Sequence, residues 1–258
     1  MTTTLNDTAK TKPLELKGMS TLASTNVIRM GIVGAPGTGK TVSAATFPNP
    51  VFLNFDNSLF HLKSLPFIDV SNIREIPFHD LTFPYRVMGI PAYKGQVPDY
   101  KTALPRWLQT EGVKLQSEHT LVIDSWTRVQ DYFSFTQEVD PENGNNHFHF
   151  WGEMLDWSTK LMSFLTSLKC NVVVIFHESA ERDKKTGELL SKMQPVQQGK
   201  FITKIGGYFP YFFRQTVKVD DKGERTFLWQ TKADKAFDPK NANNALAQYV
   251  KAEYKSLI

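Results

Sequence analysis

The stretch that decides the fold is GIVGAPGTGKT, which runs from Gly31 to Thr41. Residues 34–41 match the pattern G-x-x-x-x-G-K-[ST] at every fixed position, and the run from Val27 to Val33 before them reads as a buried strand. Glycines let the chain turn tightly, so that successive backbone N–H groups converge on phosphate oxygens at the start of the next helix. The stretch therefore predicts a strand, a phosphate-binding loop and a helix, in that order.

We expect this loop to hold a nucleoside triphosphate. Lys40 should reach the β- and γ-phosphates, and the Thr41 hydroxyl should ligate Mg2+. The predicted cofactors are ATP and Mg2+, with GTP as the other triphosphate that such a loop can serve. A glycine-rich turn that matches the pattern by accident is the alternative, and the order of strand, loop and helix argues against it. The predicted phosphate-binding residues are Gly34, Ala35, Pro36, Gly37, Thr38, Gly39, Lys40 and Thr41.

The composition indicates a soluble globular protein. The chain has 258 residues, of which 41% are hydrophobic and 22% charged, and this length suits one large α/β domain. No apolar stretch approaches the roughly 20 residues of a membrane-spanning helix, so we expect no membrane partner. The single cysteine, Cys170, excludes an internal disulfide and favours the cytoplasm, and we expect it to be buried filler. Residues 1–26 are expected to form a flexible arm without a secretory signal, and residues 27–258 the domain.

Apolar runs and helical periodicity recur along the rest of the chain. We predict buried strands at 51–56, 120–124 and 171–177, helices at 103–116, from Asp124 to about Glu138 and at 151–168, a hairpin of 212–219 and 225–231 around DDKG, and a closing helix at 244–255. Residues 57–119 are expected to elaborate the core. Strands that alternate with helices predict an α/β fold of three layers, with a mostly parallel central sheet and an antiparallel C-terminal hairpin.

Polar residues end three of the predicted strands. Asp124 is the candidate for the second ligand on the metal side, and its alternative role is to cap the next helix. Because Ser125 follows it where many ATPases have glutamate, the group that orients or deprotonates water must come from elsewhere. Asp56 is the candidate, although the sequence DNS equally suggests a turn. His177 could contact the γ-phosphate, with a structural histidine as the alternative.

Two segments favour a polyanionic partner, in keeping with a mild net charge of +4. The turn DPENGNNHFHF places His147, Phe148 and Phe150 beside amides, which would suit unstacked bases, and aromatic packing under the fold is the alternative. We expect no zinc at the H-x-H pair, because no further ligands lie nearby. Solvated surface lysines are the alternative reading of the basic segment after His177. Its candidates for nucleic acid contact are Lys184, Lys185, Lys192 and Lys200.

Taken in order, these motifs resemble those of the RecA-like recombinase ATPases, in particular the short phage-encoded RecA-like proteins of the single-strand annealing type. The loop is specific to the P-loop superfamily, and the other motifs gain their weight from their order. The segments that carry the resemblance are GAPGTGKT, FLNFDNS, LVIDSW, VVVIFHE and RTFLWQTKADKAFDPK, which together span about Val27 to Lys240.

The resemblance implies roles that spacing alone does not show. Asp56 would activate the attacking water, and His177 would sense the γ-phosphate ahead of a DNA-binding loop at about 178–200. The segment 139–150 would be the other DNA-facing loop. The sequence departs from the pattern at Asp56, where bacterial RecA has glutamate, and it contains no Phe-x-x-Ala assembly motif.

The resemblance also implies an assembly and a function. Lys232 and Lys235 would reach a neighbour's nucleotide across a subunit interface, as a finger in trans. The expected protein is an ATPase with weak, DNA-stimulated hydrolysis, which binds single-stranded DNA and anneals or exchanges strands in recombination or repair. It would assemble head to tail into a ring or helical filament and work in the cytoplasm of a bacterial host, beside a single-strand binding protein. The alternatives are a nucleotide or small-molecule kinase, a helicase or packaging-type motor, and a nucleotide-gated binding module with little catalysis.

Overall fold

A computed structural model describes residues 27–66, 68–78, 100–131, 147–181, 183–196, 199–242 and 245–258. The predicted N-terminal arm, most of the predicted loop 139–150 and the end of the helix after Asp124 lie outside the described residues. The side chains of residues 147–150 and 199–200 also lie outside them.

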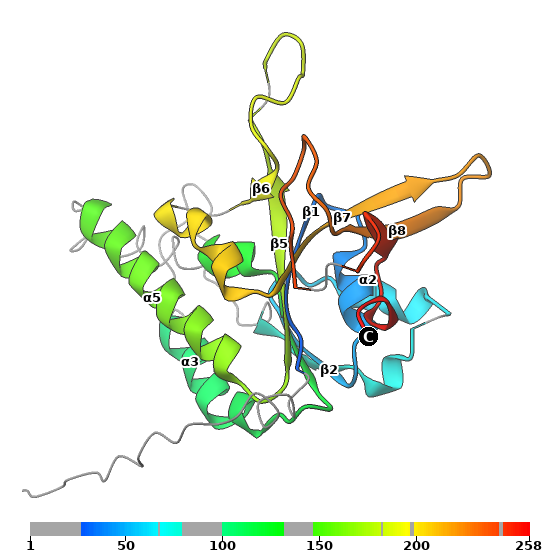
Figure 1. Cartoon of the computed structure of the whole chain (residues 1–258). Helices are drawn as coiled ribbons and strands as arrows, with labels where there is room; N and C mark the ends of the chain where they lie inside the picture. The colour runs from blue at the N-terminus through cyan, green and yellow to red at the C-terminus, as the bar shows by residue number, and fades with distance from the viewer. Residues whose placement is uncertain are drawn as a thin grey trace, which may run out of the picture.

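The core of the molecule is one mixed β-sheet (Figure 1). Its strands follow the order β10-β8-β7-β1-β5-β4-β2-β3, with β6 beside β5 and β9 beside β7. The pairs from β7 to β3 are parallel, and the pairs that involve β6, β8, β9 and β10 are antiparallel. The strands are β1 (Arg29–Gly34), β2 (Pro50–Asn54), β3 (Arg74–Ile76), β4 (Thr120–Asp124), β5 (Asn171–Ser179), β6 (Gln194–Pro195), β7 (Tyr211–Val219), β8 (Arg225–Gln230), β9 (Lys240–Asn241) and β10 (Tyr249–Lys251).

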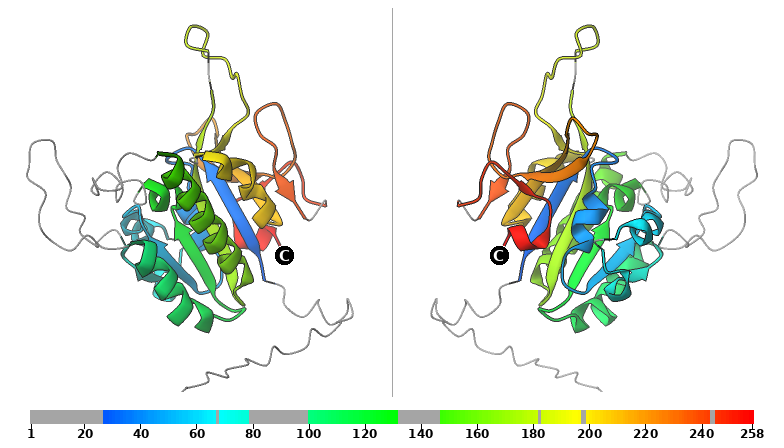
Figure 2. Two further views of the ribbon diagram at one scale, coloured as in Figure 1. Left: turned by 90° about the vertical axis from the view of Figure 1, so that its left-hand side faces the viewer. Right: turned by 90° about the vertical axis from the view of Figure 1, so that its right-hand side faces the viewer.

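Helices cover both faces of this sheet. The long helices α3 and α5 lie on one face, and the short α2 lies on the other, as Figures 1 and 2 show from three sides. The α-helices are α2 (Lys40–Ala45), α3 (Tyr100–Thr110) and α5 (His147–Ser167), and residues 126–131 are also helical. The 3-10 helices are η1 (Phe60–Ser64), η2 (Val70–Asn72), η4 (Gly112–Lys114), η5 (Gly199–Thr203), η6 (Ile205–Tyr208) and η7 (Tyr254–Ser256).

Neighbouring side chains on the central strands divide between two cores. Val33 and Leu53 pack in the cluster that includes α3 and α5, whereas Ile32 and Phe52 pack in the cluster that includes α2. All four side chains are almost completely buried. A strand that is buried on both faces reads as a continuous apolar run, which is why these strands stand out in the sequence. The predicted three-layer α/β fold is confirmed.

Most of the predicted elements are present, and the largest error is the closing helix at 244–255. That segment instead forms β10 and the 3-10 turn η7. Leu246, Val250 and Tyr254 do face the core, as the helical spacing suggested, but β10 pairs with β8. The open edge of β8 offers backbone partners that local spacing does not reveal, so tertiary pairing outweighs the local pattern. Within the predicted elaboration 57–119, β3 extends the sheet beside β2.

Residues 178–196 form a projecting hairpin, which we call the arm. It rises beyond the carboxyl ends of the parallel strands in Figures 1 and 2, and at its base Glu178 pairs with Pro195 in antiparallel register. The Asp183 carboxylate accepts hydrogen bonds from two backbone N–H groups of the turn, at 2.8 Å each. Gly187, with φ of 72°, completes this turn. The described residues of the basic segment that showed no clear period in the sequence therefore form a hairpin.

Candidate active site

The loop after β1 needs glycine for steric reasons at several positions. Gly37 and Gly39 have φ of 78° and 81°, a region that other residues rarely adopt. A Cβ on Gly39 would lie 2.6 Å from the ring of Phe227, and one on Gly34 would lie 2.8 Å from the carbonyl oxygen of Gln215. The loop is therefore pressed between its own helix and the β7–β8 hairpin.

The Lys40 side chain folds back over the start of this loop. Its Nζ donates hydrogen bonds to the carbonyl oxygens of Gly34 and Ala35, at 2.8 Å each, and the residue is buried. Burial lowers the pKa of the ammonium, while the negative charges of Asp124, Glu178 and Asp56 act in the opposite direction. A cation is thus held at the carboxyl end of β1, where an incoming triphosphate would meet it.

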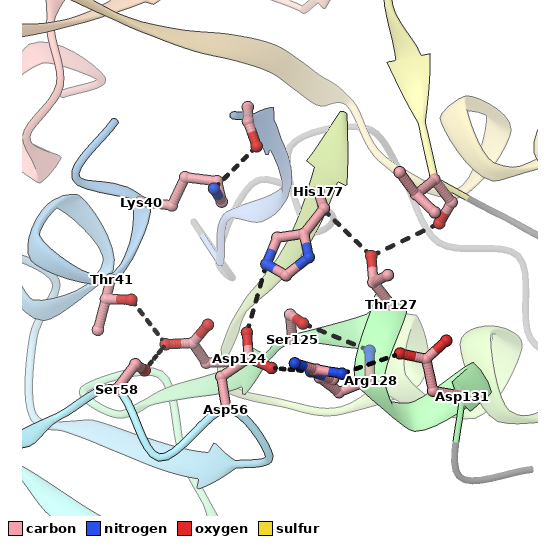
Figure 3. Close-up of polar contacts among 12 residues, drawn as sticks. Lys40, Thr41, Asp56, Ser58, Asp124, Ser125, Thr127, Arg128, Asp131 and His177 are labelled. Carbon is pink, nitrogen blue, oxygen red and sulfur yellow. Dashed lines mark hydrogen bonds and ion pairs between the residues drawn. The ribbon is translucent and has the colours of Figure 1, made fainter. Parts of the chain in front are cut away.

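Asp124 ends β4 and faces two hydroxyl groups (Figure 3). Its Oδ2 accepts hydrogen bonds from Thr41 Oγ1 at 2.7 Å and from Ser58 Oγ at 2.8 Å. Burial raises the pKa of this carboxyl group, as does the charge of Asp56, and the two hydroxyls only partly oppose them. The peptide bond from Asp124 to Ser125 is cis. Oxygen atoms from three elements therefore meet at one buried point.

Asp56, two residues beyond β2, faces an imidazole and a guanidinium in Figure 3. His177 Nε2 lies 3.4 Å from its Oδ2, and Arg128 Nε lies 3.2 Å from its Oδ1. Burial acts to raise the pKa of Asp56, but hydrogen bonds from His177 and Ser125, together with the charges of His177 and Arg128, outweigh it and lower the pKa. Asp56 is therefore held as a carboxylate beside the buried Asp124.

His177 also connects this pocket to the base of the arm. Its backbone N–H donates to Thr127 Oγ1 at 3.1 Å, and its carbonyl oxygen accepts from the N–H of Val196 at 2.7 Å. The His177 side chain thus faces Asp56, and its backbone is hydrogen-bonded to Val196 at the end of the arm. His177 therefore contacts both Asp56 and the base of the arm.

The sequence did not point to Gln215, which supports the loop from β7. It is fully buried, and its Nε2 donates to the carbonyl oxygen of Thr38 at 2.8 Å. Its Oε1 accepts from Ser43 Oγ at 2.6 Å and from Trp229 Nε1 at 3.1 Å. Gln215 stands between Arg214 and Thr216 in a strand of mixed polarity, so its residue type alone gave no signal.

The remaining predicted residues do not all reach this pocket. Lys232 and Lys235 are exposed on the loop that follows β8, and Lys184 and Lys185 are exposed on the arm. Lys192 pairs with Asp238 at 2.6 Å. The side chains of His147, Phe148, Phe150 and Lys200 lie outside the described part of the chain.

Three further expectations concern metals, membranes and the cysteine. Among the described residues, no group of three or more His, Cys, Asp or Glu side chains could hold a metal by itself, so any cation needs hydroxyl or nucleotide oxygens as well. Within the same ranges, no helix is long and apolar enough to cross a membrane. Cys170 is buried, and its burial raises the pKa of the thiol.

Comparisons with known proteins agree with this architecture. The model of the AAA domain family matches residues 26–242. No curated protein sequence gives a significant match.

Three solved structures show the range of similarity. The flagellar accessory protein FlaH from Methanocaldococcus jannaschii has 12% identity and a TM-score of 0.41, covering 79% of this chain and 76% of FlaH. The RadB recombinase has 13% identity and a TM-score of 0.42, covering 81% and 84%. A KaiC-like protein from Pyrococcus horikoshii has 12% identity and a TM-score of 0.38, covering 82% and 84%. Similarities this low carry no argument about function.

Proposed function

Because the chain belongs to the AAA domain family and is an ATPase, we propose that it uses ATP to control its hold on single-stranded DNA, in annealing or strand exchange during recombination or repair. One observation carries this proposal. The His177 side chain lies 3.4 Å from Asp56 at the proposed nucleotide site, and the next residue, Glu178, begins the arm on which Lys184 and Lys185 are exposed. His177 thus lies between the proposed site of ATP hydrolysis and the proposed DNA-binding arm.

The proposed cation is Mg2+, and the oxygen donors fit it. Thr41 and Asp124 offer a hydroxyl and a carboxylate within 2.7 Å of each other, and Mg2+ prefers such oxygen ligands together with phosphate and water. When bound, the ion would neutralise charge on the phosphates. Thr41 would give up its hydrogen bond to Asp124, and Ser58 would keep the carboxylate in place.

Asp56 is the proposed water-orienting group. Its lowered pKa makes it a weak base, so we expect it to hold and polarise the attacking water without taking its proton early. Phosphoryl transfer depends mostly on positioning and electrostatics, so such a group is sufficient for slow turnover. The low basicity supports the expectation of weak hydrolysis.

The arm offers two kinds of contact to a single strand. Lys184 and Lys185 would bind backbone phosphates, and Leu190, whose side chain is 64% exposed, would contact bases. The tip also carries carboxylates, including Asp183, which is engaged with its own turn. The net electrostatic attraction is therefore modest, which suits a grip that needs ATP.

The DNA proposal is tested by fluorescence anisotropy of labelled single-stranded DNA, with and without a slowly hydrolysed ATP analogue. We expect tighter binding with the analogue, and we expect Lys184→Ala with Lys185→Ala to weaken binding and to lower the salt slope by about 0.7 per lost phosphate contact. The matched control is Lys218→Ala with Lys222→Ala, on the other projecting hairpin. DNA binding that ignores both the analogue and the arm would refute the proposal.

Self-association head to tail is the second part of the proposal. The exposure of Lys232 and Lys235 on a loop at the carboxyl edge of the sheet supports their reaching a neighbour's nucleotide. We expect Lys40→Ala and the pair Lys232→Ala with Lys235→Ala each to abolish hydrolysis. Mixed in equal amounts, the two inactive proteins should regain about a quarter of wild-type activity, because that share of interfaces joins an intact pocket to intact lysines. No recovery on mixing would place these lysines outside the neighbour's site.

A further inference from the structure

A partly buried ion pair crosses the end of the strand that leads into the phosphate-binding loop. Arg214 on β7 and Glu178 on β5 form a bidentate pair, with Nε to Oε2 at 2.7 Å and Nη2 to Oε1 at 3.0 Å. Their side chains are only 18% and 8% exposed. Since β1 lies between β7 and β5, the pair must pass over β1 to form.

The strand register shows where the crossing occurs. Arg214 is level with Val33 on β1, and His177, directly before Glu178, is level with Gly34. Both partners therefore lie within a residue or two of the point where β1 becomes the loop. The carbonyl oxygens that hold the Lys40 ammonium belong to the same point.

The charges at this point are linked to one another. Glu178 is among the carboxylates that act on Lys40, and it is the principal partner of Arg214. One carboxylate thus acts on two cations, Lys40 and Arg214. A terminal phosphate would bring negatively charged oxygens to the end of β1. A guanidinium binds phosphate with the same bidentate geometry as it binds carboxylate.

We propose that Arg214 is a second cation for the terminal phosphate of a bound triphosphate, and that it exchanges its contact with Glu178 for a phosphate oxygen. A phosphate oxygen would compete with Glu178 for the guanidinium, so Arg214 would distinguish triphosphate from diphosphate within one protomer. The proposal rests on nucleotide binding at the loop, and it stands apart from DNA binding and assembly.

The experiment is isothermal titration with ADP and with a slowly hydrolysed ATP analogue, each with Mg2+ and without DNA. We expect Arg214→Gln to weaken binding of the analogue about 10-fold or more and binding of ADP less than about 3-fold. Glu178→Gln removes the competitor, so we expect it to leave analogue binding unchanged or to strengthen it. A second readout is the turnover number, which should fall by on the order of 100-fold in Arg214→Gln.

A double variant, Arg214→Gln with Glu178→Gln, separates this role from a structural one. It leaves no unpaired charge in a partly buried position, so it should keep a wild-type melting temperature more closely than Arg214→Gln alone. We expect it to lose discrimination between the two nucleotides as fully as Arg214→Gln. Equal weakening of ADP and analogue in Arg214→Gln, or restored discrimination in the double variant, would overturn the proposal. Wild-type protein that binds neither nucleotide would instead overturn the nucleotide site itself.

Discussion

Two carboxylates end neighbouring strands, and their surroundings differ in kind. Asp124 is buried and faces hydroxyl groups, and its burial raises the pKa of its carboxyl group. Asp56 faces His177 and Arg128, and the pKa of its carboxyl group is lowered despite burial. Asn54, two residues before Asp56, is level with Asp124 in the sheet, so the two regions are close together. Residue type alone does not distinguish these two aspartates, whereas the partners that surround each carboxylate do, and they support the different roles that we propose for them.

Replacing Asp124 tests this difference most severely. We expect Asp124→Asn to reduce hydrolysis about 1,000-fold or more, because a metal ligand is lost. Since the pKa of Asp124 is raised in the folded protein, its ionised form opposes folding at neutral pH, and the loss of stability sets in as the pH rises above the unfolded-state pKa. Without nucleotide or Mg2+, the variant should therefore melt at a higher temperature than the wild type. Each kcal/mol gained in unfolding free energy should raise the melting temperature by about 2–4 °C. A lower melting temperature at pH 7 would contradict the assignment.

The matching change at Asp56 should have the opposite effect on stability. We expect Asp56→Asn to reduce turnover about 100-fold while ATP affinity stays within about 2-fold. Because the pKa of Asp56 is lowered, its ionised form stabilises the folded protein above the unfolded-state pKa, and this contribution disappears as the pH falls through the folded-state pKa. The variant should thus melt below the wild type at pH 7. If Asp56→Asn and Asp124→Asn shifted the melting temperature equally and in the same direction, the two carboxylates would not differ in the way that we infer.

The smallest expected effect belongs to Arg128. Its side chain is 54% exposed, so its ion pair with Asp56 is screened by solvent, and we expect Arg128→Gln to cost less than about 1 kcal/mol of unfolding free energy at pH 7. Turnover should fall less than about 5-fold, since His177 and Ser125 still hold Asp56. Urea unfolding at low and high salt measures the cost, with Arg74→Gln on β3 as the control. A loss of turnover as large as that of Asp56→Asn would make Arg128 part of the chemistry.

The sequence was sufficient for the parts of the site that lie on one continuous motif or at a strand end. The loop, Thr41, Asp124, Asp56 and His177 could be predicted because parallel strands bring their carboxyl ends to one edge. Strands that are buried on both faces appear in the sequence as apolar runs, which is why the positions of most strands could be predicted. These signals are local, so they can be recognised within one short stretch of sequence.

Contacts between distant segments could not be predicted in the same way. Gln215 reaches the loop, and Arg214 reaches Glu178 across the end of β1, because β7 pairs with β1, and no short-range pattern specifies that neighbour. Ser58 was hidden in the turn DNS, where a hydroxyl suits a bend as well as it suits a carboxylate. The closing helix was wrong for the same reason, since the free edge of β8 decided the outcome.

The support from the β7–β8 hairpin has a practical consequence for protein engineering. Gln215 and Phe227 contact the phosphate-binding loop, although both lie far from it in the sequence. Arg225, on the same hairpin, donates a hydrogen bond to the carbonyl oxygen of Gly37 at 2.7 Å. A shortened version that retained the whole signature motif but stopped after β5 would lack these supports. Grafting or miniaturising this nucleotide site therefore requires the hairpin to be carried along as an integral part of the transplant.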